Sequence, residues 1–315
     1  MQKKKIIITG ANSGIGMALA EHFSLLGHHV VAVARSQGAL EKLQHSFAST
    51  LTIVIADVTK QDDRLKIKIS LSSEDTGVLL VHCAGIAIPR LLAEITEQEW
   101  DQHYFTNTKA PLFINQILLP HLKNGGRVLT VSSGLAHTPS LAMAAYGISK
   151  AALLMTKEYL NSEFGSQDIH FASAMPGVVD TPIQTYLRSC DSKRFPAVGA
   201  FHGFFQRGEL LQPTTAAKFL AWLLLNVDNE QFTRGDWNIY DVSHHHYWAQ
   251  PGEVIQRKKT DQELIKLQEQ TQGQRVNHNI THAFYFMCIV GIIAIIASAR
   301  FVSHNITAEV DAFSP

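Results

Sequence analysis

The chain has 315 residues, and its 27 lysine and arginine residues balance its 27 aspartate and glutamate residues. This balance gives no electrostatic basis for binding nucleic acid or an acidic partner, so nucleotides and small neutral molecules are the expected ligands. The three cysteines, Cys83, Cys190 and Cys288, are odd in number and far apart. They argue against a disulfide framework or a CxxC metal site and indicate a reducing compartment.

Apolar, β-branched segments recur along the first 240 residues and alternate with helical patterns. Strands this uniformly apolar are buried on both faces, so the alternation predicts a parallel, doubly wound α/β sheet between two layers of helices. The predicted strands lie at 6–9, 29–34, 51–56, 77–84, 127–133 and 169–176, with a last one near 237–242. The predicted helices span 14–26, 38–48, 97–121, 143–164 and 214–226.

The sequence TGANSGIG follows the first predicted strand and opens the first predicted helix. Gly10, Gly14 and Gly16 allow a tight turn and a close backbone approach to a pyrophosphate, while the helix N-terminus offers free N–H groups. At a strand–helix junction this motif predicts dinucleotide binding, although its spacing is G-x-x-x-G-x-G rather than G-x-G-x-x-G. The same loop contains Asn12, Ser13 and Ile15, which we expect to contact the cofactor.

Arg35 follows the second predicted strand, where an NAD-binding fold commonly has a carboxylate that accepts from the ribose 2′-hydroxyl. A guanidinium at this place suits a 2′-phosphate, so NADP(H) is predicted in preference to NAD(H); the alternative is a solvated charge at the strand end. After the third predicted strand, Asp57, beside Val58, is predicted to accept from the adenine amino group or, alternatively, to cap the next helix.

Tyr146 and Lys150 lie four positions apart in the predicted helix 143–164 and therefore share one helix face. The ammonium is predicted to lower the pKa of Tyr146, so that the phenol can exchange a proton with a carbonyl oxygen. Ser132 and Ser133 end a predicted strand at the carboxyl edge, where open parallel sheets bind ligands, and a hydroxyl there is predicted to hold the same oxygen. Asn107, on the preceding predicted helix, is expected to hold a water or a backbone carbonyl that completes a proton path to Lys150.

Together these motifs resemble the short-chain dehydrogenase/reductase family over roughly residues 3–245. The matches are the glycine motif, Asp57, Ala84 and Gly85, the set Asn107, Ser133, Tyr146 and Lys150, and PGVVDT with Pro176, Gly177, Val179 and Thr181. The resemblance implies a Rossmann-type domain that transfers hydride between nicotinamide C4 and a substrate carbon. It further implies that Tyr146 is the acid/base, that Ser133 orients the carbonyl, and that Lys150 lowers the tyrosine pKa and binds the ribose. Asn107 is implied to maintain the relay, and PGVVDT to contact the nicotinamide carboxamide.

The segments after residue 175 look like those of sepiapterin reductase and the bacterial benzil reductases, which implies an NADPH-dependent carbonyl reductase acting on a diketone or a related ketone. In the motif HCAG, His82 and Cys83 replace two asparagines of the family, so His82 must supply the first asparagine's hydrogen bonds or they are lost. Ser13 stands where NADP enzymes often have a basic residue, so Arg35 has less help from other basic residues in binding the 2′-phosphate. The alternatives are a membrane-bound 3-keto-lipid reductase of the 3-ketosphinganine type and, from another class, a non-catalytic NADP-sensing or scaffolding protein.

The stretch 183–212 is long and irregular, which predicts a functional flap or, alternatively, a surface insertion. Its residues Phe201, Phe204 and Phe205 are expected either to line an apolar lid over the substrate or to pack against another subunit or the membrane. The run SHHHYW, 243–248, is not predicted to bind a metal, because consecutive residues of an extended chain point in opposite directions.

The composition changes near residue 249, and we predict a catalytic domain at 1–248, a polar stalk at 249–282, a transmembrane helix at 283–302 and a short tail at 303–315. The run AFYFMCIVGIIAIIASA with Phe301 and Val302 reaches the length of about 20 apolar residues that a span needs; a buried core helix is the alternative. Basic residues precede this run, whereas Glu309 and Asp311 follow it, so the catalytic domain is expected in the cytoplasm. By resemblance, a homodimer or homotetramer is expected.

Overall fold

The computed structural model describes residues 2–253 and 255. Seven strands form one sheet in the order β3-β2-β1-β4-β5-β6-β7, and every neighbouring pair is parallel. The strands are β1 (Lys5–Thr9), β2 (His29–Ala34), β3 (Leu51–Ile55), β4 (Leu79–His82), β5 (Gly126–Val131), β6 (Ile169–Met175) and β7 (Asp236–Asn238). The predicted parallel sheet of Rossmann type is confirmed, and its order reverses between β1 and β4. In open parallel sheets, ligands bind at the carboxyl ends of the strands where the order reverses.

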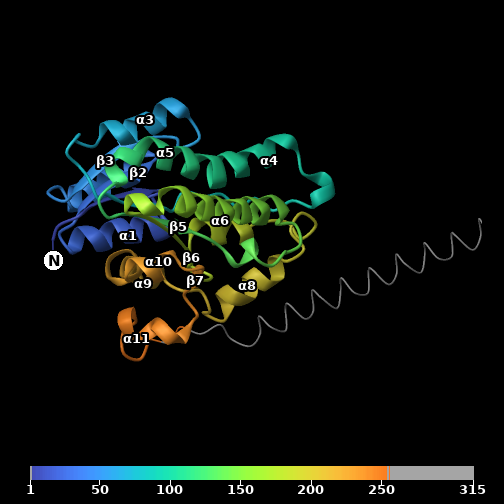
Figure 1. Cartoon of the computed structure of the whole chain (residues 1–315). Helices are drawn as coiled ribbons and strands as arrows, with labels where there is room; N and C mark the ends of the chain where they lie inside the picture. The colour runs from blue at the N-terminus through green and yellow to red at the C-terminus, as the bar shows by residue number, and fades with distance from the viewer. Residues whose placement is uncertain (1, 254, 256–315) are drawn as a thin grey trace, which may run out of the picture. The chain divides into compact units, whose positions relative to one another are not determined.

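Helices cover both faces of this sheet (Figure 1). One face carries α1 (Gly14–Leu25), α2 (Gln37–Ser46) and α9 (Pro213–Asn226), and the other carries α3 (Gln61–Ile69), α5 (Ala110–Leu122) and α6 (Ala144–Phe164). Leu19 of α1 and Phe219 of α9 are fully buried in one apolar cluster, and Ile67 of α3 and Ile114 of α5 are buried in the other. Each such side chain contributes about 1.5–3 kcal/mol on burial, so the two apolar layers fix the helices against the sheet.

The predicted helix 97–121 is a single helical run in three parts. These are α4 (Glu97–Tyr104), the π-helical segment η2 (Phe105–Lys109) and α5. Within η2 the Thr108 hydroxyl donates to the Ser149 carbonyl of α6 at 2.8 Å, which ties the widened turn to the helix that carries Tyr146. Single π-turns inside α-helices occur frequently at functional sites.

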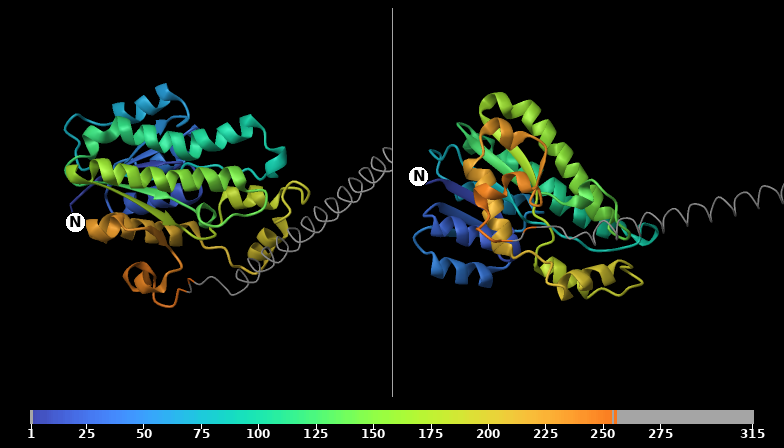
Figure 2. Two further views of the ribbon diagram at one scale, coloured as in Figure 1. Left: turned by 45° about the vertical axis from the view of Figure 1, so that its right-hand side comes forward. Right: turned by 90° about the horizontal axis from the view of Figure 1, so that it is seen from below.

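The prediction of an irregular 183–212 stretch was wrong, because two helices occupy much of it, α7 (Pro182–Arg188) and α8 (Val198–Gln206). In Figure 2 the yellow segment that contains α8 extends outward from the rest of the domain. The prediction also missed α3, α10 (Asn229–Thr233) and α11 (His245–Trp248). The last strand is shorter than predicted, since β7 ends at Asn238.

Within the described residues, no helix combines the length and the apolar character needed to cross a bilayer. The predicted span 283–302 and tail 303–315, with most of the predicted stalk, lie outside the part of the chain that the structure describes.

Candidate active site

Tyr146 and Ser133, two of the predicted catalytic residues, meet at the carboxyl end of β5. Ser133 lies two residues after this strand, and Tyr146 is in the first turn of α6. Their side chains are hydrogen-bonded to each other, and Ser133 Oγ also accepts from the Leu135 amide at 3.2 Å. The two hydroxyls are therefore placed where they can contact one substrate oxygen together.

Apolar side chains surround the phenol of Tyr146. It packs against a cluster formed by Ala87, Ala142, Met143, Leu187 and Phe195. Burial among them raises the pKa of Tyr146 above its ordinary value, while the hydrogen bond with Ser133 opposes the rise. This direction corrects the predicted lowering, because the apolar surroundings remove the water that would stabilise a phenolate. A phenol that stays protonated at neutral pH is suited to donate a proton.

Lys150 is almost fully buried one turn along α6 from Tyr146. Its Nζ donates to the Val131 carbonyl at 2.8 Å and lies 5.8 Å from the centre of the Tyr146 ring. Burial lowers the pKa of Lys150 to about 8, whereas Cys83 and Asp236 act in the opposite direction. The ammonium is thus close to its titration point at neutral to mildly alkaline pH.

Asn107 is fully buried in η2, and its amide holds the backbone just beyond β4. Its Oδ1 accepts from the Ile86 amide at 2.9 Å, and its Nδ2 donates to the Ile86 carbonyl and to Ser149 Oγ, each at 2.9 Å. A Cβ on Gly85 would lie 3.4 Å from Asn107 Oδ1 and 3.7 Å from Lys150 Nζ. The side chains of Asn107 and Lys150 therefore both lie close to Gly85. Asn107 was expected to hold a water or a backbone carbonyl, and in the structure it holds the carbonyl of Ile86.

The glycine motif forms a tight turn with no room for side chains. A Cβ on Gly10, whose φ is +70°, would lie 2.7 Å from the Ala84 amide nitrogen, and a Cβ on Gly16 would lie 2.3 Å from the Gly10 carbonyl oxygen. On Gly14, at φ +52°, a Cβ would lie 2.9 Å from the Thr181 methyl group. Three predicted cofactor segments, the glycine loop, Ala84 and Thr181, therefore converge at the carboxyl edge.

A cavity of about 760 Å³ borders this loop between α1, α7 and α9. Gly14 and Thr181 line it, together with residues such as Glu21, Tyr186 and Pro213. None of the four predicted catalytic side chains is in its lining. The helix α1 begins with Ser13 as its N-cap, and the Ser13 side chain makes no hydrogen bond to the helix. The glycine turn and this helix N-terminus fit the pyrophosphate of a dinucleotide.

Other predicted cofactor residues lie around the same edge. Asn12 Nδ2 donates to Ser36 Oγ at 2.8 Å beside the exposed Arg35 at the end of β2. Asp57 Oδ1 accepts from the amide and the hydroxyl of Thr59 at 3.0 and 2.7 Å, whereas the N-cap of α3 is Lys60, so the alternative role of Asp57 as a helix cap is wrong.

The remaining predicted cofactor residues offer mainly their backbone. Ile15, Val58 and Val179 turn their side chains into the apolar core. Gly177, which follows Pro176, has a φ of +81°, and a Cβ there would lie 2.7 Å from the hydroxyl of Tyr240. These positions can hold a ligand through amide and carbonyl groups.

His82 and Cys83 fill the positions where the family pattern has asparagines. His82 Nε2 is 2.8 Å from Asn115 Oδ1 of α5, so this histidine supplies a bond between the sheet and a helix. Burial lowers the pKa of His82 to about 4 and raises the pKa of Cys83 to about 12. Both side chains are therefore uncharged at neutral pH.

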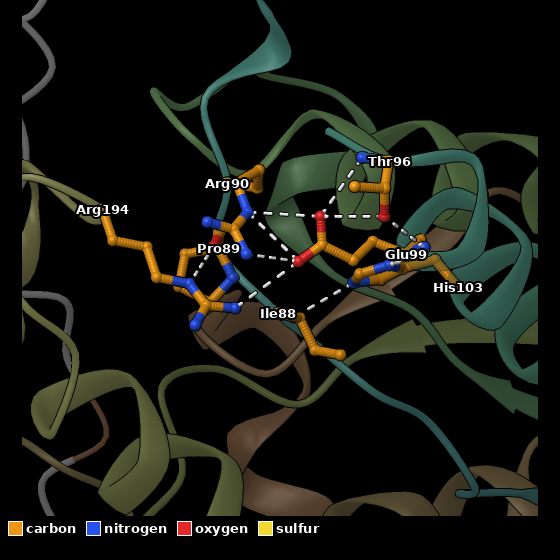
Figure 3. Close-up of polar contacts among 7 residues, drawn as sticks. All are labelled: Ile88, Pro89, Arg90, Thr96, Glu99, His103 and Arg194. Atoms are coloured by element: carbon orange, nitrogen blue, oxygen red, sulfur yellow. Dashed lines mark hydrogen bonds and ion pairs between the residues drawn. The ribbon is translucent and has the colours of Figure 1, made fainter. Parts of the chain in front are cut away.

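Arg194 ties the segment between α7 and α8 to the loop after β4 (Figure 3). Its Nε donates to the Pro89 carbonyl at 3.0 Å, and its guanidinium lies 3.7 Å from the carboxylate of Glu99. Glu99 also binds Arg90 at 2.6 Å. The next residue, Phe195, is fully buried in the apolar cluster around Tyr146. The network thus holds an aromatic side chain close to the candidate proton donor.

Two of the three predicted lid phenylalanines extend this aromatic contact. The Phe201 ring is 5.0 Å from that of Phe195, and the Phe204 ring is 6.0 Å from that of Phe201. Phe205 is 54% exposed, and its ring lies 4.4 Å from the guanidinium carbon of Arg188.

The histidine run 243–248 packs instead of gathering around one point. His244 is buried, its Nε2 is 3.0 Å from the Asn238 carbonyl, and its Nδ1 accepts from Trp248 Nε1 at 2.9 Å. In residues 2–253 and 255, no group of three or more His, Cys, Asp or Glu side chains could hold a metal.

Sequence reasoning missed several residues near the site. They are Arg194, Phe195, Ser149, His137 and Asp236. Ser149 lies between Tyr146 and Lys150 on α6, but the spacing does not show its bond to Asn107. The other four belong to no local motif, and each reaches the site through long-range packing or hydrogen bonds.

Residues 4–191 match the family model described as short chain dehydrogenase. The chain is 35% identical over 233 residues to an uncharacterized oxidoreductase of Schizosaccharomyces pombe, which covers 71% of this chain and 92% of that protein. It is 28% identical over 244 residues to benzil reductase ((S)-benzoin forming) of Bacillus subtilis, which covers 75% of this chain and 97% of that protein. The solved structure of L-sorbose reductase from Gluconobacter frateurii with NADPH and L-sorbose has a TM-score of 0.65 at 25% identity, over 76% of this chain and 95% of that one. The chain therefore belongs to the short-chain dehydrogenase family and is an NAD(P)-dependent oxidoreductase.

Proposed function

We propose that this protein is an NADPH-dependent carbonyl reductase that converts an apolar ketone to an alcohol, with Tyr146 as the proton donor. The observation that carries the proposal is the Ser133–Tyr146 hydroxyl pair, which faces an apolar cluster and lies one helical turn from Lys150. The bound dinucleotide supplies the hydride, and with it two electrons, to the carbonyl carbon. Side chains of the protein bind and protonate the oxygen of the same carbonyl.

In this reaction Ser133 donates a hydrogen bond to the carbonyl oxygen and Tyr146 gives that oxygen its proton. The raised pKa of Tyr146 supports the direction of reduction, because a neutral phenol is the form that can donate. Lys150, held by the Val131 carbonyl, presents a positive charge near the tyrosinate that remains and favours its formation. Asn107 keeps the Ile86 backbone in place beside Gly85 and Lys150.

Arg35 supports the choice of NADPH. It is exposed at the end of β2, beside Ser36 and Asn12, where the glycine loop and the second strand meet. A guanidinium binds a 2′-phosphate, whereas a carboxylate repels it. We expect Arg35→Asp to lower the affinity for NADPH and to leave the affinity for NADH little changed, as measured by fluorescence titration. An unchanged NADPH preference would contradict this assignment.

The surroundings of Tyr146 support an apolar substrate. Its neighbours Ala87, Met143, Leu187 and Phe195 offer no side-chain charge, so a ketone with aromatic or aliphatic flanks fits better than a sugar or an acid. Benzil, the substrate named for the Bacillus relatives, is a compound of this kind.

The test is oxidation of NADPH by full-length protein with benzil, quinones and 3-keto lipids, compared between wild type and Tyr146→Phe. Turnover in the wild type that is lost in the variant supports the proposal. NADPH binding without turnover of any ketone would favour the sensor or scaffold alternative. If the protein reduced only 3-keto lipids, the result would favour the alternative of a 3-keto-lipid reductase over a reductase of compact ketones.

We also propose that residues 283–302 anchor the protein in a membrane, with the catalytic domain on the cytoplasmic side. The support is the apolar sequence of this run and the basic residues before it. Alkaline extraction of membranes from cells that produce the full chain, beside a chain ending at Gln250, tests it. Release of both proteins by alkali would contradict an anchor.

Exposed apolar side chains on neighbouring helices support the expected homodimer or homotetramer. They lie on α4, η2 and α6 and include Trp100, Tyr104, Phe105, Ile148, Met155 and Tyr159. We propose that they pack against a second copy of the chain. Sedimentation of the chain ending at Gln250 as a monomer would contradict this.

A further inference from the structure

We propose that Asp236 is a positioning residue for the reduction, because its carboxylate holds the chain on both sides of Ser133. Its Oδ2 accepts from Ser132 Oγ at 2.8 Å and from His137 Nε2 at 2.8 Å. Ser132 directly precedes Ser133, and His137 follows it by four residues. A single oxygen atom thus fixes both ends of the short loop that presents the Ser133 hydroxyl to Tyr146. The catalytic part of this inference rests on the proposed function, and the geometric part rests on these contacts alone.

The carboxylate is itself firmly placed. Asp236 begins β7, where it pairs with Ser173 of β6, and its side chain is only 8% exposed. The preceding residue, Gly235, accepts at its carbonyl from the buried Lys157 Nζ at 2.9 Å. A buried carboxylate is costly unless it is hydrogen-bonded, so the bonds from Ser132 and His137 offset the cost of burying Asp236.

One oxygen of this carboxylate lacks a partner within the described residues. Asp236 Oδ1 is buried and makes no hydrogen bond there. Within the described residues, the cost of burying this carboxylate is therefore offset only through the two bonds to Oδ2. Loss of either donor is expected to affect the other, because both act through the same atom.

The loop between the two donors is held on its other side by the catalytic helix. Residues 134–136 form a 3₁₀ turn, and a Cβ on Gly147 of α6 would lie 2.8 Å from the Leu135 carbonyl oxygen. Gly147 directly follows Tyr146, so the turn lies against the backbone that carries the phenol. With the β7 carboxylate on one side and α6 on the other, Ser133 has little freedom to move relative to Tyr146.

Asp236 also acts on the proton path through its charge. It raises the pKa of Lys150 against the lowering caused by burial, and Cys83 is the other group that acts in this direction. Cys83 stays an uncharged thiol at neutral pH, so of these two groups only the Asp236 carboxylate can act on Lys150 through a negative charge. Removing it is expected to lower the pKa of Lys150 further, which a purely structural role in the loop would not do.

The experiment compares Asp236→Asn and Asp236→Ala with Ser132→Ala, His137→Ala and the double variant S132A/H137A, using benzil and NADPH. The matched control is Asp168→Asn. This variant alters another aspartate–histidine pair, Asp168 with His170 at 2.9 Å, at the opposite end of β6. Asparagine tolerates the left-handed backbone of Asp168, whose φ is +57°.

We expect Asp236→Ala to lower kcat about tenfold, with KM and the Kd for NADPH little changed, since the loss concerns the transition state. The double variant S132A/H137A should also lower kcat, because it removes both contacts to the carboxylate, but its alkaline fall should not move to lower pH, because the charge of Asp236 is kept. In Asp236→Asn, the alkaline fall of the pH–rate profile should move to lower pH. The inference is overturned if kcat of Asp236→Ala equals that of Asp168→Asn. Ser132→Ala and His137→Ala each leave one contact intact, so they serve if the Asp236 variants do not fold.

A second measurement separates this inference from the proposed function. Amide hydrogen exchange in the turn reports its stability without any substrate, because Ala136 N bonds to the Ser133 carbonyl and His137 N and Thr138 N bond to the Gly134 carbonyl. We expect these three amides to exchange faster in Asp236→Ala, with the β5 and β6 amides unchanged. If wild type reduces no ketone, the proposed function fails, and the exchange result still decides whether Asp236 holds the loop. Unchanged exchange in the turn would refute that.

Discussion

Lys150 Nζ lies 5.8 Å from the centre of the Tyr146 ring while it donates a hydrogen bond to the Val131 carbonyl. The two residues share a helix face, but burial shifts their pKa values in opposite directions, upward for the phenol and down to about 8 for the ammonium. At neutral pH the pair is therefore a neutral phenol beside an ammonium. In the proposed reduction, this is the state from which Tyr146 gives its proton to the substrate, and the ammonium stabilises the phenolate that remains.

The rate of reduction should fall as the pH rises through about 8, where Lys150 loses its proton. The phenol titrates at higher pH, so Tyr146 remains a donor throughout this fall. The pH dependence of kcat with benzil and NADPH measures it. A rate that stays constant well above pH 8 would show that the charge on Lys150 is not needed.

Asn107→Ala should reduce both stability and turnover. It removes both side-chain bonds to Ile86, at 2.9 Å each, and leaves partly buried backbone groups unsatisfied, at a cost of about 2 kcal/mol. Asn161 provides a matched control, because it makes the same two bonds to the Phe171 backbone, at 2.8 and 2.9 Å. Urea unfolding and kcat should show that Asn161→Ala loses stability alone. Equal loss of kcat in both variants would contradict a role for Asn107 beside Lys150.

His82 should make the protein less stable in acid. Its folded pKa of about 4 lies below the ordinary value of 6.5, so the unfolded chain binds the additional proton between these two pH values. Stability is therefore lost as the pH falls from about 6.5 to about 4, by about 3 kcal/mol for this group. Unfolding of His82→Asn should show a smaller loss over this range, whereas the exposed His29→Asn should behave like wild type. Equal losses in all three proteins would contradict this assignment.

Arg194→Ala should weaken substrate binding without altering the chemistry. It removes the bond to Pro89 and the ion pair with Glu99 (Figure 3). These contacts hold the segment whose next residue, Phe195, belongs to the apolar cluster against which Tyr146 packs. We expect KM for benzil to rise about fivefold, the equivalent of about 1 kcal/mol for a partly exposed pair, with kcat little changed. Arg234→Ala, which removes the exposed pair with Glu230, is the control. A KM that changes equally in both variants would separate Arg194 from the substrate site.

The sequence predicts the sheet and the glycine loop well, because both depend on local patterns. Six of the seven strands lie within or close to their predicted ranges, since buried parallel strands are uniformly apolar. The helices α7 and α8 were not predicted, because this short, aromatic-rich segment is stabilised by tertiary contacts such as that between Phe195 and Phe201.

The candidate site is predictable to the extent that its groups share a motif. The spacing of Tyr146 and Lys150 indicates their common face, but the direction of the tyrosine pKa depends on burial, which the spacing does not contain. Asp236 meets Ser132 across 104 residues of chain, through the pairing of β6 with β7. No local pattern near Asp236 indicates that contact.

In the proposed reduction, the Tyr146 hydroxyl supplies the proton to the substrate oxygen. Tyr146→Phe removes that oxygen alone and keeps the ring within its apolar cluster, so the fold and NADPH affinity should be retained. Single-turnover reduction of benzil by the NADPH-bound variant should be slower than wild type by about 10²–10⁴-fold, the contribution typical of a positioned general acid. A single-turnover rate within a few-fold of wild type would contradict the account.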